Sequence, residues 1–122
     1  MQNYKDLEIY KLAHELAVKV HIMSLSLPKF EMYEQGSQIR RSSKSVSATI
    51  VEGFGRKKYQ QEFIKFLTYA LSSVDETKEH LDLLFETNSL DDKDLYESLQ
   101  KNYNVLGKKI YRFRETVINK IN

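Results

Sequence analysis

The segment Gly-Phe-Gly-Arg-Lys-Lys at positions 53–58 combines glycines with three basic side chains, as phosphate-binding loops do. It does not match the P-loop pattern G-x-x-x-x-G-K-[ST], and it lacks the third glycine and the preceding strand of a dinucleotide-binding motif. A glycine in the left-handed conformation at a helix end would explain Gly53 without a ligand. Arg56, Lys57 and Lys58 would then precede the positive end of the next helix, where anions bind favourably.

The three histidines do not have the spacing of a metal site. None follows a glutamate by three residues, as the di-iron helical bundles require. His14 and His21 would lie about 10 Å apart along a helix, too far to share one ion, whereas Glu76 and His80 are one turn apart and are predicted to bond each other. The chain has no Cys, which excludes thiolate nucleophiles and zinc–sulfur sites. We therefore predict no enzymatic activity, no metal and no cofactor.

The elements that position these residues are predicted to be helices. Apolar residues recur three and four positions apart, which predicts helices at about 5–27, 37–53, 60–87 and 92–121. Pro28 is expected to end the first helix, Gly36 or Ser37 to cap the second, and Ser89 or Asp91 to cap the fourth. Four amphipathic helices with short connections predict a single all-α domain over residues 1–122, an antiparallel up-and-down four-helix bundle.

The third and fourth helices carry the clearest apolar faces. The third is expected to bury Phe63, Leu67, Ala70, Val74, Thr77, Leu81 and Leu84. The fourth is expected to bury Leu95, Leu99, Tyr103, Leu106, Ile110, Phe113, Val117 and Ile121. The second helix is rich in small residues between Ser42 and Thr49, which allow a neighbouring backbone to approach closely.

Further apolar residues lie outside these faces and predict a second buried surface. Apolar groups on two sides of a helix indicate burial on both sides, and in a four-helix bundle the second side would contact another subunit. We therefore predict a closed homo-oligomer with the interface candidates Phe66, Tyr69, Ser73, Leu83, Tyr111 and Ile118. The alternative is that these are scattered exposed apolar groups, which are common on protein surfaces.

The net charge is only +2, but the charges are segregated along the chain. One interpretation is a nucleic-acid interface built from Arg40, Arg41, Lys44, Arg56, Lys57, Lys58, Lys108 and Arg112. The other is a protein-binding adaptor without nucleic-acid binding, whose basic groups pair with an acidic ridge, within the fold or between subunits; the ridge comprises Asp75, Glu79, Asp82 and Glu86. Glu52 is expected to bond Arg41 or Arg56 at the corner between two helices.

The chain shows no signal segment among its first residues and no run of about 18 apolar residues. We therefore expect a cytoplasmic protein that does not contact a membrane.

Three segments resemble a known family: DLEIYKLAHELA, SQIRRSSKSVSATIVEGFGRK and EFIKFLTYALSSVDE. They are similar, over nearly the whole chain, to the four-helix-bundle proteins named for intervening sequences in 23S ribosomal RNA genes. This resemblance implies a ring-like homo-oligomer, with a pentamer favoured. It also implies a relation in fold to the accessory proteins of diversity-generating retroelements, which associate with nucleic acid and a reverse transcriptase. Thr49, Tyr59 and Leu71 depart from the family pattern.

The function implied by the resemblance is a non-enzymatic helical oligomer associated with RNA or DNA. The family name records where some of its genes lie, so it does not by itself indicate a ribosomal component.

Overall fold

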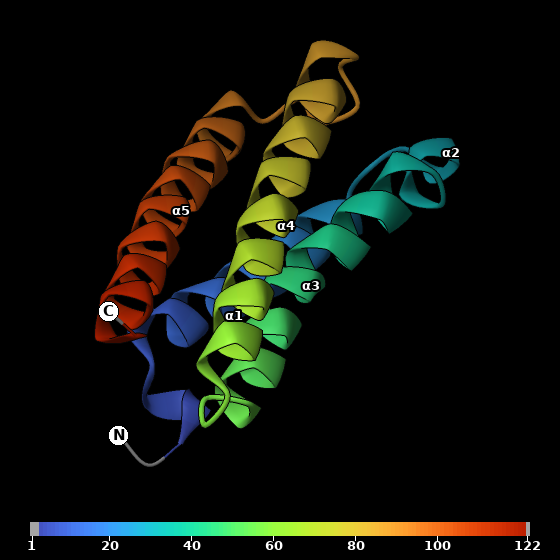
Figure 1. The fold of residues 1–122 in the computed structure, drawn as a ribbon. Helices are drawn as coiled ribbons and strands as arrows, with labels where there is room; N and C mark the ends of the chain where they lie inside the picture. The colour runs from blue at the N-terminus through green and yellow to red at the C-terminus, as the bar shows by residue number, and fades with distance from the viewer. Residues whose placement is uncertain (1–2, 122) are drawn as a thin grey trace.

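The computed structural model describes residues 3–121, and within them it contains four long α-helices and no strand (Figure 1). The long helices are α1 (Glu8–Ser24), α3 (Gln35–Gly55), α4 (Gln60–Glu86) and α5 (Lys93–Ile121). Two short helices, η1 (Tyr4–Asp6) and α2 (Lys29–Met32), precede α1 and α3. No helix in this part of the chain is both long and apolar enough to cross a membrane.

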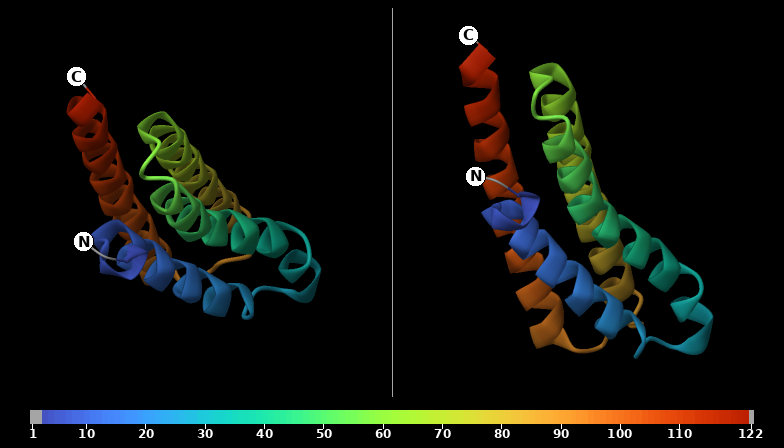
Figure 2. Two further views of the ribbon diagram at one scale, coloured as in Figure 1. Left: turned by 60° about the horizontal axis from the view of Figure 1, so that its bottom comes forward. Right: turned by 90° about the horizontal axis from the view of Figure 1, so that it is seen from below.

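The long helices pack around one apolar core. α3 lies between α1 and α4, α4 also packs against α5, and α1 crosses to contact α5 (Figures 1 and 2). The buried residues of α4 are the seven predicted from its apolar spacing. In α5, Leu99, Tyr103, Leu106, Ile110 and Val117 are buried, while Leu95 and Phe113 pack at the edge of the core. The side chain of Ile121 lies outside the described residues.

The first two predicted helices differ most from the structure. The segment 5–27 is divided into the short η1 and α1, and α1 ends at Ser24, four residues before Pro28. Pro28 then occupies the position before α2, where its fixed φ angle suits a helix start. By contrast, α4 and α5 begin and end within one residue of their predicted bounds.

The predicted caps of α3 and α5 are wrong. The Gln35 backbone N–H at the start of α3 donates to Glu31 Oε1 at 3.1 Å, and Gly36 is buried inside the helix. At the start of α5 the Leu95 N–H donates to Asp92 Oδ1 at 3.0 Å. Asp92 directly precedes the helix, so its carboxylate reaches the third helical N–H as an N-cap side chain does.

Gly53 does not end α3 in the left-handed conformation. No glycine in the described residues has a positive φ, and α3 continues to Gly55. A Cβ atom at Gly53 would stand 2.9 Å from Phe66 Cβ and 3.2 Å from Phe63 Cδ1. The glycine therefore allows the close approach of α3 to α4 at this point.

Candidate nucleic-acid interface

The turn between α3 and α4 places Arg56, Lys57 and Lys58 on the surface. Arg56 Nη1 lies 2.9 Å from Glu62 Oε1, and its guanidinium carbon is 4.7 Å from the centre of the Phe66 ring. The ion pair and the cation–π contact hold Arg56 against the beginning of α4. The carboxylate that pairs with Arg56 is therefore Glu62, which corrects the expectation that Glu52 would do so.

Lys57 and Lys58 form no ion pair within the described residues. Lys57 Nζ lies 4.0 Å from the centre of the Phe54 ring. Lys57 also lines a hollow of about 320 Å³ together with Lys120, which α5 brings to the same end of the molecule (Figure 1). Lys120 was not a sequence candidate, because its proximity to residue 57 depends on the packing of α5.

Arg40 is used inside the fold. Its Nη1 donates to Ser24 Oγ at 2.9 Å and its Nη2 donates to the Met32 carbonyl oxygen at 3.0 Å. These bonds join the ends of α1 and α2 to α3. Arg41 and Lys44, on the same helix, are exposed and form no ion pair in the part of the chain described.

Lys108 and Arg112 are exposed along a groove of about 470 Å³ between α4 and α5. Neither forms an ion pair among the described residues. Tyr103 lines the same groove; its buried hydroxyl has no hydrogen-bond partner within residues 3–120, and burial raises the pKa of this group above its usual value.

The acidic ridge forms no ion pair with the basic candidates in the described part of the chain. Asp82 accepts hydrogen bonds from the Tyr96 hydroxyl at 2.6 Å and from Gln100 Nε2 at 2.7 Å, and the first bond raises the pKa of Tyr96. Asp75, Glu79 and Glu86 are exposed. Of the ridge, Asp75 lies near basic candidates, in the groove that Lys108 and Arg112 also line.

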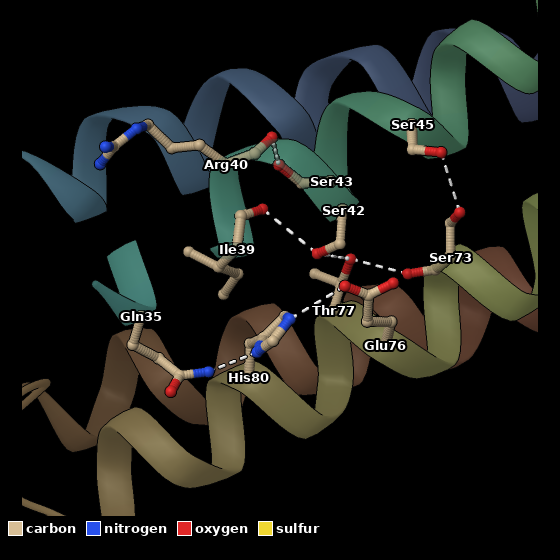
Figure 3. Close-up of polar contacts among 10 residues, drawn as sticks. All are labelled: Gln35, Ile39, Arg40, Ser42, Ser43, Ser45, Ser73, Glu76, Thr77 and His80. Atoms are coloured by element: carbon tan, nitrogen blue, oxygen red, sulfur yellow. Dashed lines mark hydrogen bonds and ion pairs between the residues drawn. The ribbon is translucent and has the colours of Figure 1, made fainter. Parts of the chain in front are cut away.

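A layer of small polar side chains joins α3 to α4 (Figure 3). The Ser45 and Ser73 hydroxyls are 3.0 Å apart, and the Thr77 hydroxyl donates to Ser42 Oγ at 2.8 Å. Ser42 in turn donates to the Ile39 carbonyl oxygen at 3.3 Å. The small residues of α3 therefore do allow close helix packing, and their hydroxyls satisfy one another where water is excluded.

His80 ends this layer in a structural arrangement (Figure 3). Its Nε2 lies 3.1 Å from Glu76 Oε2, as the one-turn spacing predicted, and its Nδ1 contacts the side-chain amide of Gln35. The Glu76 carboxylate can only accept, so the hydrogen bond between these two side chains is donated by His80 Nε2. No cluster of three or more potential metal-ligating side chains occurs in the residues that the structure describes.

The six interface candidates occupy two different environments. Phe66 and Ser73 are half-buried against α3: Phe66 lies beside Gly53, and Ser73 is hydrogen-bonded to Ser45. This side of α4 therefore faces a neighbouring helix of the same chain. The others reach the surface: Ile118 is half-buried, and the exposed fractions are 46% for Tyr69, 42% for Leu83 and 50% for Tyr111.

A further apolar surface lies at the C-terminal end of α1 and was not a sequence candidate. Val18, Ile22 and Leu25 are exposed, Ile22 by 63%. Their spacing of four and three residues was visible in the sequence, but it runs beside the stronger line of buried residues on the same helix.

Fold and surface together define a small all-helical protein with exposed basic side chains that form no ion pair within the described residues. A comparison with protein families matches residues 5–112 to the 23S rRNA-intervening sequence protein family, and the chain belongs to that family. A solved structure from Bacteroides thetaiotaomicron, described as a protein of unknown function from the S23 ribosomal protein family, is similar with a TM-score of 0.75. It is 26% identical, and the match covers 87% of this chain and 97% of that one. A comparison with curated proteins finds no match.

Proposed function

We propose that this protein is a non-enzymatic, cytoplasmic helical scaffold that binds RNA or DNA through its basic side chains. The observation that carries the proposal is that most of these groups are exposed and unpaired in the described residues, although the chain has almost as many acidic as basic groups. Unpaired Lys and Arg side chains can neutralise phosphates and release counterions, the main source of affinity for nucleic acids.

The proposed contact set is narrower than the sequence suggested. Arg40 is left out because its guanidinium bonds two other segments of the chain. Arg56 has a carboxylate partner and contributes less than its neighbours. The proposed contacts are therefore Arg41, Lys44, Lys57, Lys58, Lys108 and Arg112, with Lys120 added from the structure.

The proposal includes an antiparallel arrangement of the four helices and a ring-like homo-oligomer, with a pentamer favoured. The ring is implied by the resemblance to the 23S rRNA-intervening sequence family. The nucleic-acid partner is supported by a proposed relation in fold to the accessory proteins of diversity-generating retroelements. A ring would repeat each basic surface around its axis, and multivalent contact would raise the overall affinity without any new contact.

A salt titration tests this function. We expect the protein to bind a mixed RNA and duplex DNA pool, with the log of the affinity falling by about 0.7–0.9 per log unit of salt for each phosphate neutralised. Lys57→Gln together with Lys58→Gln should reduce that slope by about 1.4–1.8 per binding subunit, as two lost phosphate contacts require. Lys11→Gln together with Lys29→Gln, two exposed lysines outside the proposed set, is the matched control and should change it little.

The competing function is a protein-binding adaptor whose basic groups pair with acidic groups of another subunit. Absence of binding at low salt would contradict the scaffold proposal and leave the adaptor as the working function. Equal effects of the double variant and its control would show that the turn between α3 and α4 is not the contact.

A further inference from the structure

The groove between α4 and α5 has an apolar floor and a mainly basic rim. Val74 and Tyr103 are buried beneath it. Lys78, Lys108 and Arg112 line it together with one acidic residue, Asp75. This combination suits a ligand that has both a flat apolar part and negative charge.

Tyr111 supplies an exposed aromatic ring to the same groove. The Arg114 guanidinium carbon lies 5.2 Å from the centre of this ring, and Arg114 Nη1 donates to Thr68 Oγ1 on α4 at 3.1 Å. The cation–π contact and the hydrogen bond to the neighbouring helix together restrict the orientation of the ring. A restrained aromatic ring beside basic side chains has the features of a base-stacking platform.

Gly107 keeps the floor of the groove open. A glycine in a helix interior lowers helix stability relative to alanine. Packing does not require it here, because a Cβ atom at position 107 would meet only Val74 Cγ1, at an ordinary distance of 3.5 Å. This differs from Gly53, where a Cβ atom would overlap α4. The contact between the two helices therefore does not require a glycine here, whereas a larger side chain would narrow the groove that Gly107 lines.

We propose that this groove binds an unpaired nucleotide of a single-stranded nucleic acid. The base stacks on Tyr111, and the adjoining phosphates contact Lys108 and Arg112. This inference rests on the proposed function and deepens it, since it requires a single strand: the faces of the bases in a duplex are covered by their neighbours, whereas an unpaired base can stack on a side chain. Tyr111 is thereby assigned to ligand binding and not to a subunit interface.

Fluorescence anisotropy with three labelled oligonucleotides of equal length tests the proposal, in RNA and in DNA form. The first is a mixed-sequence single strand, the second its duplex, and the third an abasic strand with the same phosphates and no bases. We expect the single strand to bind about tenfold more tightly than the abasic strand, the effect of one stacked base. Equal affinities for the two would overturn the inference.

Substitutions locate the effect in the groove. Tyr111→Leu and Gly107→Leu should each remove the preference for bases over the abasic strand, whereas Tyr111→Phe should retain it. Leucine favours a helix more than glycine does, so the melting temperature of the Gly107→Leu protein should rise. A loss of binding in this variant would then not be due to unfolding. Tyr33→Leu, a substitution of an exposed tyrosine outside the groove, is the matched control.

The outcomes distinguish failure of the proposed function, which is nucleic-acid binding, from failure of the inference that a base stacks in the groove. Absence of binding to every oligonucleotide at low salt overturns the proposed function and the inference together. Binding that is unaffected by Tyr111→Leu and Gly107→Leu overturns the inference alone. A change of oligomeric mass for Tyr111→Leu, measured by light scattering, would place Tyr111 in a subunit contact and also overturn it.

Discussion

At the residue scale, three helical glycines have three different roles. Gly53 is enclosed by α4, Gly55 has no atom within 4 Å of a hypothetical Cβ, and Gly107 faces a groove. Glycine therefore occurs at a close contact between helices, at an open helix end and at an open surface. Only the distances to the neighbouring helix distinguish these roles.

Gly53→Ala is expected to destabilise the fold by about 1–3 kcal/mol, the usual cost of adding a methyl group to a packed contact. The new Cβ atom would stand 2.9 Å from Phe66 Cβ, an atom close to the backbone that cannot move without shifting α4. Urea denaturation measures the change. Gly55→Ala is the matched control, and its stability should be unchanged or slightly raised; equal effects at both positions would contradict the role given to Gly53.

At the element scale, the end of α4 is formed by Asn88 and not by a glycine. Asn88 has a φ of 66°, and it is the one non-glycine residue with a positive φ in the described residues. The Ser89 N–H donates to the Leu84 carbonyl oxygen at 3.0 Å, and the Asn88 N–H donates to that of Phe85 at 3.1 Å. This is the hydrogen-bond pattern of a Schellman motif, which turns the chain from α4 toward α5.

Asn88→Val should lower the free energy of unfolding by about 1–2 kcal/mol, because a β-branched residue is strained in the left-handed conformation. Asn88→Gly should not lower it, since glycine adopts a positive φ freely. Thermal or urea denaturation of the two variants gives the comparison. If valine and glycine had the same effect, the backbone conformation would not be the reason for the asparagine.

At the scale of the whole molecule, exposed apolar side chains occur in two separate parts of the fold. Tyr69 and Leu83 lie on α4, while Val18 and Ile22 lie on α1 and Leu25 directly follows it. A ring built by head-to-tail contact pairs two different surfaces of each subunit. Two separate apolar surfaces therefore fit the proposed ring better than a single patch would.

Light scattering at micromolar concentration should detect a species several times heavier than the 14.4 kDa chain. Leu83→Lys should shift it toward the monomer while circular dichroism remains helical, because a charge would be buried without a partner in the contact. Thr116→Lys adds the same charge at an exposed site on α5 and should leave the mass unchanged. A wild-type protein of 14 kDa would exclude the ring.

The sequence by itself determined the four long helices, although not the bounds of the first two, and it determined the buried face of α4. The resemblance to the family was also visible in the sequence. Helical periodicity is a local property. The apolar line from Phe63 to Leu84 could therefore be assigned to the core without knowing which helix packs against it. The spacing of Glu76 and His80 likewise predicted their bond, since one helical turn separates them.

Only the tertiary structure decided which of the predicted surface side chains are exposed and which contact other helices of the chain. Arg40 and Arg41 are adjacent in the sequence, yet Arg40 bonds Ser24 and Met32 while Arg41 is exposed. Phe66 and Ser73 were predicted to lie on an outer face, but both contact α3 and are half-buried. Such differences depend on the angle and distance between helices, which are set by long-range packing and not by the spacing of residues along one helix.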